Sequence, residues 1–310
     1  GLAVTSELAK LRACDTFIVC VPTPIHKDRR PDLEPLRSAS ESVGQIMRKG
    51  ALVIFESTVY PGVTEEYCGP ILARISGLKQ GRDFKLGYSP ERINPGDKER
   101  RFDNILKVVS GDTPQSLDVI DKVYASVVSA GTHRAASIKI AEFAKVLENT
   151  QRDVNIALAN QFARFAEQSG IDIHAVIEAC NSQPFSHIHS PGVAVGGHCI
   201  PVYPHLYLST DPSAEIVRVA RSTNAAMPDV TCERLASAFE GSLAGLRVVI
   251  LGAAYRGGVK ETAFSGVFPL VDALRRRHAV PLVHDPLYDD KELRALGLTP
   301  FHRGEQADAV

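Results

Sequence analysis

Residues 51-ALVIFESTVYPG-62 join an apolar run to a polar turn, and this junction indicates the fold. The apolar part is short and rich in β-branched residues, which is typical of a buried strand. Pro61 and Gly62 then favour a turn. Residues 16-TFIVCVPTP-24 repeat the same pattern, with a second apolar run that ends at Pro-Thr-Pro.

Two helix-like stretches alternate with these strands and with a third strand. The first covers about residues 33–50, the second covers 63-VTEEYCGPILARIS-76, and 84-FKLGYSPERINPG-96 is a strand followed by a proline-rich loop. This alternation predicts an α/β fold in which a parallel sheet carries helices on its faces. Ligands bind beyond the carboxyl ends of the strands in such sheets. We therefore expect the polar loops after the strands to lie together at one rim.

A long helix of about 30 residues is predicted next, from a cap at Ser137 to a stop at Gly170. Its polar residues Lys145, Asn149 and Arg152 are four and three positions apart, so they line one stripe. A second helical region covers about residues 213–240. The apolar residues of the long helix share another face: Ile140, Ala144, Leu147, Val154, Leu158, Phe162 and Phe165.

The last part of the chain returns to a strand pattern. Residues 246-LRVVILGAAYRGG-258 and 280-VPLVHDP-286 are predicted strands, and a helix over about 266–277 joins them. This is a second strand-helix-strand unit, and it is incomplete. Two sheet regions joined by a helical middle predict three domains: residues 1–134, 135–241 and 242–310.

The composition argues against several classes of partner. The 310 residues carry a formal net charge of -1, which favours neither nucleic acid nor an anionic membrane surface. No apolar run reaches the ~18 residues of a membrane-spanning helix, and no signal-peptide pattern is visible. The cysteines show no paired spacing, which predicts a reduced, cytoplasmic protein: Cys14, Cys20, Cys68, Cys180, Cys199 and Cys232.

Residues 195-VGGHCIPVYPH-205 place Cys199 between two glycines and two prolines. Glycine permits close approach and proline fixes the local geometry, so the thiol is a candidate nucleophile. A buried or incidental cysteine is the alternative. A metal site is a third interpretation because several histidines are near in sequence, but no spacing resembles a zinc knuckle, and we predict no metal.

Other polar residues also have ordinary interpretations. Lys145 and Asn149 can belong to a solvated helix face. A helix that joins two sheet domains is expected to be shielded, however, and a shielded lysine needs a charge partner or a role. Thr23, Ser57 and Thr58 can be simple turn residues, which is the more frequent case. Glu91 and Arg92 can form a surface ion pair.

Together these segments resemble the UDP-sugar 6-dehydrogenase family, whose members oxidise the primary alcohol of a UDP-hexose to a carboxylate with two NAD. The resemblance covers essentially the whole chain. The SPERINPGD form resembles the branch that acts on UDP-N-acetylhexosamines, and UDP-glucose 6-dehydrogenase, which gives UDP-glucuronate, is the alternative. Six motifs occur in the family's order: 20-CVPTP-24, 56-ESTVYPG-62, 88-YSPERINPGD-97, 145-KVLENTQRD-153, 196-GGHCIPV-202 and 250-ILGAAYRGGVKE-261.

The resemblance implies two Rossmann-like parallel-sheet domains, both incomplete here, joined by a helical central domain with one long helix. Residues 1–134 would bind NAD, residues 135–241 would form the central catalytic and dimerisation domain, and residues 242–310 would bind the UDP-sugar. Family members pair through the central helical region, so we expect a homo-oligomer. The product would serve as a precursor of surface polysaccharide.

The resemblance also implies a chemistry. Cys199 would attack the aldehyde formed by the first hydride transfer, and a second hydride transfer would convert the thiohemiacetal into a thioester that water hydrolyses. Lys145 would stabilise the alkoxide and take part in proton transfer, and Asn149 would donate to the same oxygen or hold a water. Glu91 is the candidate base for the hydrolytic water, and Thr58 would help to place it.

The binding residues follow from the same resemblance. The implied NAD contacts are Pro22, Thr23, Ser57, Thr58, Glu91, Cys199 and Arg256. The implied UDP-sugar contacts are Glu91, Arg92, Ile93, Lys145, Asn149, Arg152, Phe185, Gly196 and Tyr255.

Family members open with a strand, a G-x-G-x-x-G turn and an acidic residue after the second strand. No such fingerprint precedes Gly1, and the last sheet is not completed. We therefore expect a fragment of a longer enzyme. Without the amides that hold the NAD pyrophosphate, this chain by itself is expected to bind NAD poorly or not at all and to be inactive.

Two positions depart from the family pattern. Tyr203 stands where members commonly have an aspartate four residues after the cysteine, and Ala263 stands where many have an arginine. The first departure removes a carboxylate that could orient water. The second alters how a nucleotide is held at the domain junction.

Two remote alternatives belong to other classes. One is an NAD-independent hydrolase that uses Cys199 with a histidine, in which Cys199→Ala would remove all activity. The other is a non-catalytic assembly module in which the long helix only dimerises. Binding of a UDP-sugar through Lys145 and Arg152 would argue against the assembly module.

Overall fold

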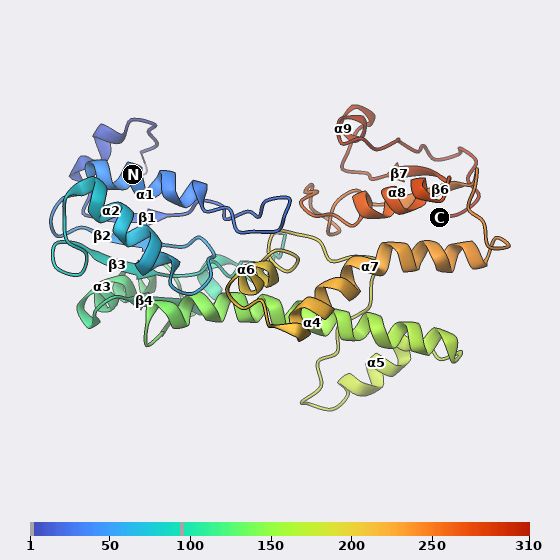
Figure 1. The fold of residues 1–310 in the computed structure, drawn as a ribbon, viewed down its shortest axis with the longest axis horizontal. Coiled ribbons are helices and arrows are strands. Elements are labelled where there is room, and N and C mark those ends of the chain that lie inside the picture. Colours follow the sequence, from blue (N-terminus) through green and yellow to red (C-terminus); the bar gives the residue numbers. More distant parts are fainter. Residues whose placement is uncertain (1–2, 94–95) are drawn as a thin grey trace. The chain divides into compact units, whose positions relative to one another are not determined.

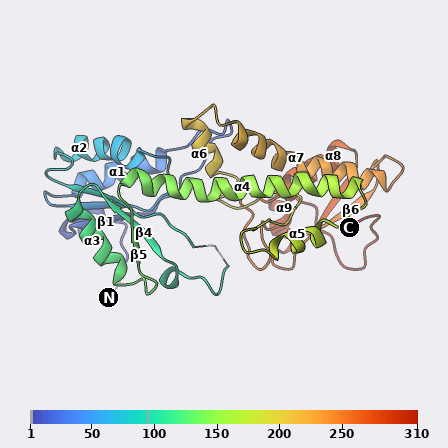
Figure 2. The ribbon, with the colours of Figure 1, turned by 90° about the horizontal axis from the view of Figure 1, so that it is seen from below.

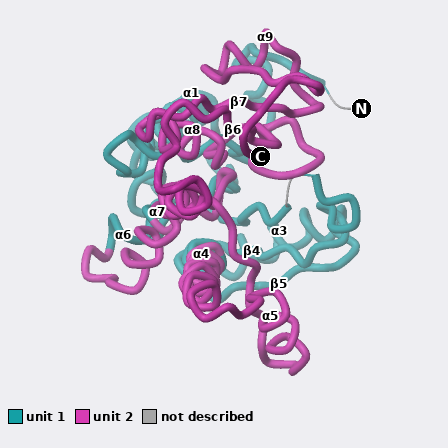
Figure 3. Tube along the Cα trace, turned by 90° about the vertical axis from the view of Figure 1, so that its right-hand side faces the viewer, with its two compact units in different colours: residues 1–148, 205–210 teal, residues 149–204, 211–310 magenta. Residues whose placement is uncertain are grey.

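The computed structural model describes residues 3–93 and 96–310. The chain divides into two compact units, which Figure 3 distinguishes by colour. Unit 1 comprises residues 1–148 and 205–210, and unit 2 comprises residues 149–204 and 211–310. The long helix α4 (Ile138–Gln168) and the short helix α6 (Tyr203–Thr210) each contain a boundary between the units. The division into three domains remains a prediction.

Unit 1 is built on a five-stranded sheet with the order β1-β2-β3-β4-β5. β1 pairs with β2 and β2 pairs with β3, both in parallel, which confirms the parallel sheet predicted for these segments. The strands are β1 (Thr16–Val19), β2 (Leu52–Phe55), β3 (Lys85–Tyr88), β4 (Lys107–Gly111) and β5 (Thr132–Arg134).

Both faces of β2 are covered, which explains its continuous apolar sequence. Successive side chains of a strand point to opposite faces. Val53 and Phe55 belong to the core that includes residues of α1 (Glu34–Ile46) and α2 (Gly69–Ser76). Leu52 and Ile54 pack instead with residues of α3 (Pro114–Ala125). Figure 2 shows α1 and α2 on one side of the strands and α3 on the other.

The sequence analysis missed β4, β5 and α3, and the sheet is not parallel throughout. β3 and β4 pair in antiparallel fashion. The described residues between β3 and β4 form no crossover helix, which is the usual connection between parallel neighbours. They contain one 3₁₀ turn, η3 (Phe102–Asn104). Two residues of the predicted motif 88-YSPERINPGD-97, Asn94 and Pro95, lie outside the described residues.

The helix predicted over residues 63–76 begins as a π-helical turn, η2 (Val63–Cys68), and continues as α2. Gly62 precedes it with a φ of 99°, in the left-handed region that favours glycine. The amides of Gly62 and Thr64 donate hydrogen bonds to the Glu142 carboxylate at 2.6 and 2.9 Å. These bonds tie η2 to α4. Burial raises the pKa of Glu142.

Helix α4 is 31 residues long and begins and ends where the sequence predicted. Ser137 Oγ accepts a hydrogen bond from the Ile140 amide at 3.2 Å, and Gly170 has a φ of 66°. Its polar stripe is buried at Glu142, Lys145, Asn149 and Asp153. Its apolar stripe is exposed instead, at Ile140, Phe143, Leu147, Leu158, Phe162 and Phe165.

In unit 2, a buried polar network joins α7 (Glu215–Ser237) to the C-terminal part of α4. Asp153 Oδ1 accepts hydrogen bonds from Arg221 at 2.6 Å and from Asn224 at 2.8 Å. Asn224 in turn accepts one from Asn160 at 2.9 Å. Burial raises the pKa of Asp153, and the Arg221 charge opposes that shift. These hydrogen bonds fix α7 on α4. Helix α5 (Ile173–Asn181) follows the end of α4.

The predicted second strand-helix-strand unit is present in unit 2. β6 (Arg247–Leu251) and β7 (Val280–His284) pair in parallel and are connected through α8 (Val267–Arg276). Single bridges extend this sheet, between Val248 and Ala309 and between Val283 and Pro300. Figure 1 shows α8 beside the two strands, and α9 (Asp290–Ala295) follows β7. Among the described residues, no helix is both long and apolar enough to cross a membrane.

Candidate active site

The carboxyl ends of β1 and β2 meet at one rim of the unit 1 sheet, as the sequence predicted. Ser57 Oγ donates a hydrogen bond to the Val21 carbonyl at 2.6 Å. The Cys20 thiol donates to Glu56 at 3.3 Å. The loops after β1 and β2 are therefore joined at two points.

The residues predicted to contact NAD in these two loops differ in exposure. Ser57 and Thr58 are buried, and Pro22 is exposed. Thr23 Oγ1 is buried and has no hydrogen-bond partner among the described residues. A buried hydroxyl of this kind needs a hydrogen-bond partner, which the described part of the chain does not supply. The rim therefore fits a polar cofactor group at the place where α/β sheets bind ligands.

A buried lysine joins this rim to the loop after β3. Lys107 is 3% exposed, and its Nζ lies 3.3 Å from Glu91 Oε2 and 3.4 Å from Glu56 Oε1. The Tyr124 hydroxyl also donates to Glu56 Oε1, at 2.6 Å. Glu91 Oε1 accepts the amides of Arg92 and Ile93, at 2.6 and 2.7 Å. Both carboxylate oxygens of Glu91, the candidate base, therefore have a partner.

The sequence analysis missed Lys107, Glu56 and Tyr124. Lys107 interrupts the otherwise apolar stretch 105-ILKVV-109, and a charge inside a buried strand is a signal that could have found it. Tyr124 has no comparable signal, since it lies at an ordinary apolar position of α3. Burial, and then the Glu56 carboxylate, raise the pKa of Cys20 to about 12. The same two causes raise the pKa of Tyr124.

Arg92 and Lys145 complete the predicted set in unit 1. The Arg92 guanidinium forms an ion pair with Glu148 on α4 and donates to the Leu106 carbonyl at 3.1 Å. Ile93 is exposed. Lys145 is buried, as expected for a shielded lysine.

In unit 2, the glycines before Cys199 have a clear structural reason. A Cβ on Gly196 would lie 2.6 Å from the Cβ of Tyr255, and one on Gly197 would lie 3.2 Å from the Tyr255 ring. Gly197 also has a φ of 91°, and its amide donates to the Ala263 carbonyl at 2.9 Å. The cysteine loop therefore packs directly on the loop that follows β6, where no side chain would fit.

Cys199 itself is half-buried, and its thiol donates to the Tyr203 hydroxyl at 3.4 Å. The aspartate expected from the family pattern is thus replaced by a neutral group that still reaches the sulfur. His198 Nε2 lies 3.6 Å from Glu261 Oε2 on the neighbouring loop. The Ala263 amide, and then His198, hold the pKa of Glu261 below its usual value.

The remaining predicted residues of unit 2 lie in different surroundings. Asn149 is buried, Arg152 is exposed, and Phe185 is 89% exposed in the loop after α5. Tyr255 and Arg256 line a cavity of about 700 Å³ beyond the carboxyl ends of β6 and β7. Asp285 anchors this cavity's loop, because its Oδ2 accepts the Ala253 amide at 2.8 Å.

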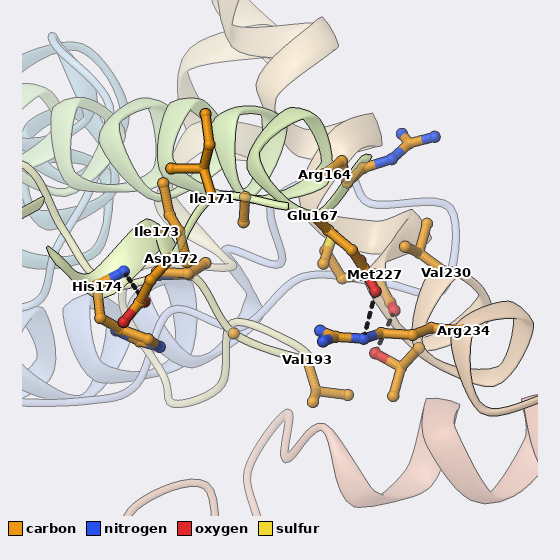
Figure 4. A pocket seen from close by; sticks show the side chains of 14 residues that line it. Arg164, Glu167, Ile171, Asp172, Ile173, His174, Val193, Met227, Val230 and Arg234 are labelled. Atoms are coloured by element: carbon orange, nitrogen blue, oxygen red, sulfur yellow. Dashed lines mark hydrogen bonds and ion pairs between the residues drawn. The ribbon is translucent and has the colours of Figure 1, made fainter. Parts of the chain in front are cut away.

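A second cavity of about 430 Å³ lies between α4, α7 and the segments 171–174 and 191–193. Figure 4 shows the Glu167–Arg234 ion pair, 2.6 Å long, at its edge and Asp172 at its other end. None of the residues predicted from the sequence to belong to the site lines it.

The predicted residues divide between the two units. The unit 1 group comprises Pro22, Thr23, Ser57, Thr58, Glu91, Arg92, Ile93 and Lys145. The unit 2 group comprises Asn149, Arg152, Phe185, Gly196, Cys199, Tyr255 and Arg256.

Comparison with known proteins identifies the class of enzyme. The pattern of the UDP-glucose/GDP-mannose dehydrogenase family, NAD binding domain, matches residues 1–128, and that of the family's central domain matches residues 139–226. The chain belongs to this family of NAD-dependent dehydrogenases.

Individual relatives differ in the UDP-sugar that their names give as substrate, and in their identity to this chain. A UDP-N-acetyl-D-glucosamine 6-dehydrogenase from Pseudomonas aeruginosa is 43% identical over 96% of this chain and 72% of its own length. The UDP-D-ManNAc dehydrogenase structure from Pyrococcus horikoshii is 35% identical, has a TM-score of 0.86, and covers 93% of this chain and 71% of its own. A UDP-glucose dehydrogenase structure from Pyrobaculum islandicum is 25% identical and has a TM-score of 0.85. The match covers 96% of this chain and 71% of that structure's chain.

Proposed function

We propose that the protein oxidises the 6-hydroxymethyl group of a UDP-N-acetylhexosamine to a carboxylate, with NAD as the oxidant in both steps. The observation that carries the proposal is the thiol of Cys199, held in a glycine loop against the Tyr255 loop of a nucleotide-sugar dehydrogenase fold. The higher identity to the N-acetylhexosamine enzymes supports this substrate class over UDP-glucose. The product is a uronate for surface polysaccharide precursors.

Bound NAD supplies the hydride acceptor. Pro22, Thr23, Ser57 and Thr58 form the rim of the sheet where the cofactor is proposed to bind, and the buried Thr23 hydroxyl offers it a hydrogen bond. Glu91, Cys199 and Arg256 are the further proposed contacts. The NAD-binding, central and sugar-binding domains are proposed at residues 1–134, 135–241 and 242–310.

The residues of the chain divide the chemical work. Lys145 and Asn149 stabilise the oxygen of the alcohol as its proton leaves, and Lys145 takes part in the proton transfer. Cys199 adds to the aldehyde and retains it as a thiohemiacetal, so that the second oxidation gives a thioester on the same sulfur. Glu91, with Thr58, then activates water, and hydrolysis releases the carboxylate and the thiol.

Binding of the UDP-sugar is proposed for residues of both groups. Arg92 and Arg152 supply positive charge, which suits a diphosphate. Ile93, Phe185, Gly196 and Tyr255 supply the remaining contacts.

The test is the stoichiometry of the reaction. The purified protein, in the longest form that its gene encodes, is mixed with NAD and with UDP-N-acetylglucosamine, UDP-N-acetylgalactosamine, UDP-N-acetylmannosamine or UDP-glucose. Two NADH per sugar with an N-acetylhexosamine, and a much slower reaction with UDP-glucose, are the expected results. One NADH per sugar, or none with every sugar, contradicts the proposal.

We further propose a homo-oligomer that forms through α4. Its exposed apolar stripe contains Phe143, Phe162 and Phe165, and exposed aromatic stripes of this kind are typical of protein interfaces. Phe162→Glu on this stripe is expected to lower the mass measured by light scattering. A mass that equals one chain in the unaltered protein contradicts this part.

We also propose that the protein works in the cytoplasm. All six cysteines lie among the described residues, and all six are free thiols. Free thiols persist in a reducing compartment. Fractionation of the cells that express the protein tests this placement.

A further inference from the structure

We propose that Lys107 is a positioning residue for hydrolysis: it holds the carboxylate of Glu91 in place for the step that releases the product. This inference rests on the proposed function, because that function makes Glu91 the base. The observation behind it is the contact between the Lys107 ammonium, buried at the start of β4, and Glu91 Oε2, 3.3 Å away.

The surroundings of Lys107 account for a buried cation. An ammonium taken out of water must find charge partners. Lys107 Nζ lies between the carboxylates of Glu56 and Glu91, and it also lies 5.0 Å from the ring centre of Phe102 and 5.3 Å from that of Tyr124. Ring faces attract cations, so four groups hold the ammonium at one point.

Glu56 serves as the fixed anchor of this arrangement. It accepts the Tyr124 hydroxyl at 2.6 Å and the Cys20 thiol at 3.3 Å, in addition to its contact with Lys107. Both donors are neutral, because the pKa of Cys20 is raised to about 12 and that of Tyr124 is raised as well. Glu56 is therefore fully engaged and 15% exposed, whereas Glu91 is 40% exposed and open to water.

The anchor fixes the orientation of Glu91. Lys107 holds Oε2, and the amides of Arg92 and Ile93 hold Oε1. A carboxylate restrained at both oxygens keeps its remaining lone pairs in a constant direction. A general base must lie within hydrogen-bond reach of the proton that it takes, and a small displacement costs a large factor in rate.

The net charge of the cluster formed by Glu56, Glu91 and Lys107 also suits hydrolysis of the thioester. Two carboxylates and one ammonium give a net charge of -1, so a proton taken up by Glu91 makes the cluster neutral. In hydrolysis, water forms the new carbon–oxygen bond and gives its proton to Glu91. The carbon–sulfur bond then breaks, and the Cys199 thiolate recovers a proton. No oxidant is consumed in this step.

The test separates hydrolysis from hydride transfer. Lys107→Met keeps the length of the side chain and removes its charge. Both hydride transfers precede hydrolysis, so this variant should give a rapid burst of two NADH per active site and then a steady rate roughly ten- to hundredfold below that of the unaltered protein. Intact-protein mass spectrometry of quenched samples should show the sugar held on Cys199.

Two matched variants give the readouts that a purely structural role would not produce. Lys107→Arg keeps the charge and should recover the steady rate to within about fivefold. In a protein that already carries Glu91→Gln, adding Lys107→Met should lower the steady rate by less than about twofold. The effects of residues that act through one another are not additive. A burst that falls in parallel with the steady rate, or full additivity in this background, overturns the proposal.

A charge-compensated variant covers the case in which Lys107→Met does not fold. Lys107→Met with Glu56→Gln removes one charge of each sign, and it leaves no carboxylate in the buried anchor unpaired. The burst should persist and the steady rate should again fall. An unchanged steady rate overturns the role of Lys107. If the unaltered protein gives no NADH with any UDP-sugar, the proposed function fails as well, and the two failures are thereby distinguished.

Discussion

Cys20 and Cys199 both follow a strand or turn at a candidate binding surface, one in each unit, but their thiols face different partners. Cys20 donates to the carboxylate of Glu56, and Cys199 donates to the hydroxyl of Tyr203. A carboxylate can only accept, so it favours the protonated thiol, whereas a hydroxyl can reverse its bond and donate to a thiolate. Burial of the sulfur, and then the Glu56 carboxylate, raise the pKa of Cys20 to about 12. Burial and a carboxylate partner together keep Cys20 protonated, whereas the hydrogen-bond partner of the Cys199 thiol is the neutral Tyr203 hydroxyl.

The largest expected effect separates the two cysteines by activity. Cys199→Ser should lower uronate formation by at least about 10³-fold, because a serine does not replace the thiolate as a covalent partner. Cys20→Ser is the matched control and should stay within about twofold. Uronate is measured by chromatography beside NADH. Loss of activity in the Cys20 variant alone would reverse the assignment.

The next effect tests the loop that carries Cys199. Gly196→Ala should destabilise the fold by about 2 kcal/mol, because its new methyl group would overlap with Tyr255. Gly192→Ala is the control, since the nearest atom to its new Cβ would be 3.9 Å away. Denaturant unfolding gives both free energies. Equal stability of the two variants would show that the close approach to Tyr255 has no energetic consequence.

A smaller effect concerns the suppressed thiol of Cys20. Glu56→Gln removes the charge that opposes the thiolate, so the pKa of Cys20 should fall and its alkylation by iodoacetamide at pH 8.5 should speed up about tenfold. Peptide mass spectrometry measures the rate for each cysteine. Cys199 serves as the internal control and should react at an unchanged rate. If Cys20 stays inert, burial alone suppresses it.

The smallest effect concerns the departure at position 203. Tyr203→Phe removes the hydroxyl that the thiol contacts, which should slow both alkylation of Cys199 and steady turnover about fivefold, the worth of one neutral hydrogen bond. Tyr288→Phe, on another loop of unit 2, is the control. A rate equal to that of the unaltered protein would mean that the hydroxyl does not assist the sulfur.

The sequence predicted those parts of the site that depend on local patterns. Apolar runs that end in polar loops gave the first three strands, and their parallel order placed Ser57 beside Val21 at one rim. The steps of three and four along α4 gave its length and both ends. The same steps gave no information on which stripe is buried, because the stripe at Glu142 and Asp153 is satisfied by partners far away in the chain.

What the sequence by itself determined is the family, the alternation of strands and helices, and the chemical identity of the candidate nucleophile in its glycine loop. These follow from short motifs whose physics is local, such as a φ that favours glycine at Gly197 or an apolar run that must be buried. Only the tertiary structure decided the partners: Tyr203 on the Cys199 thiol, Tyr255 against the two glycines, and Lys107 between Glu56 and Glu91. Charge pairing and close packing join residues that are distant along the chain, and no local pattern encodes which of them will meet.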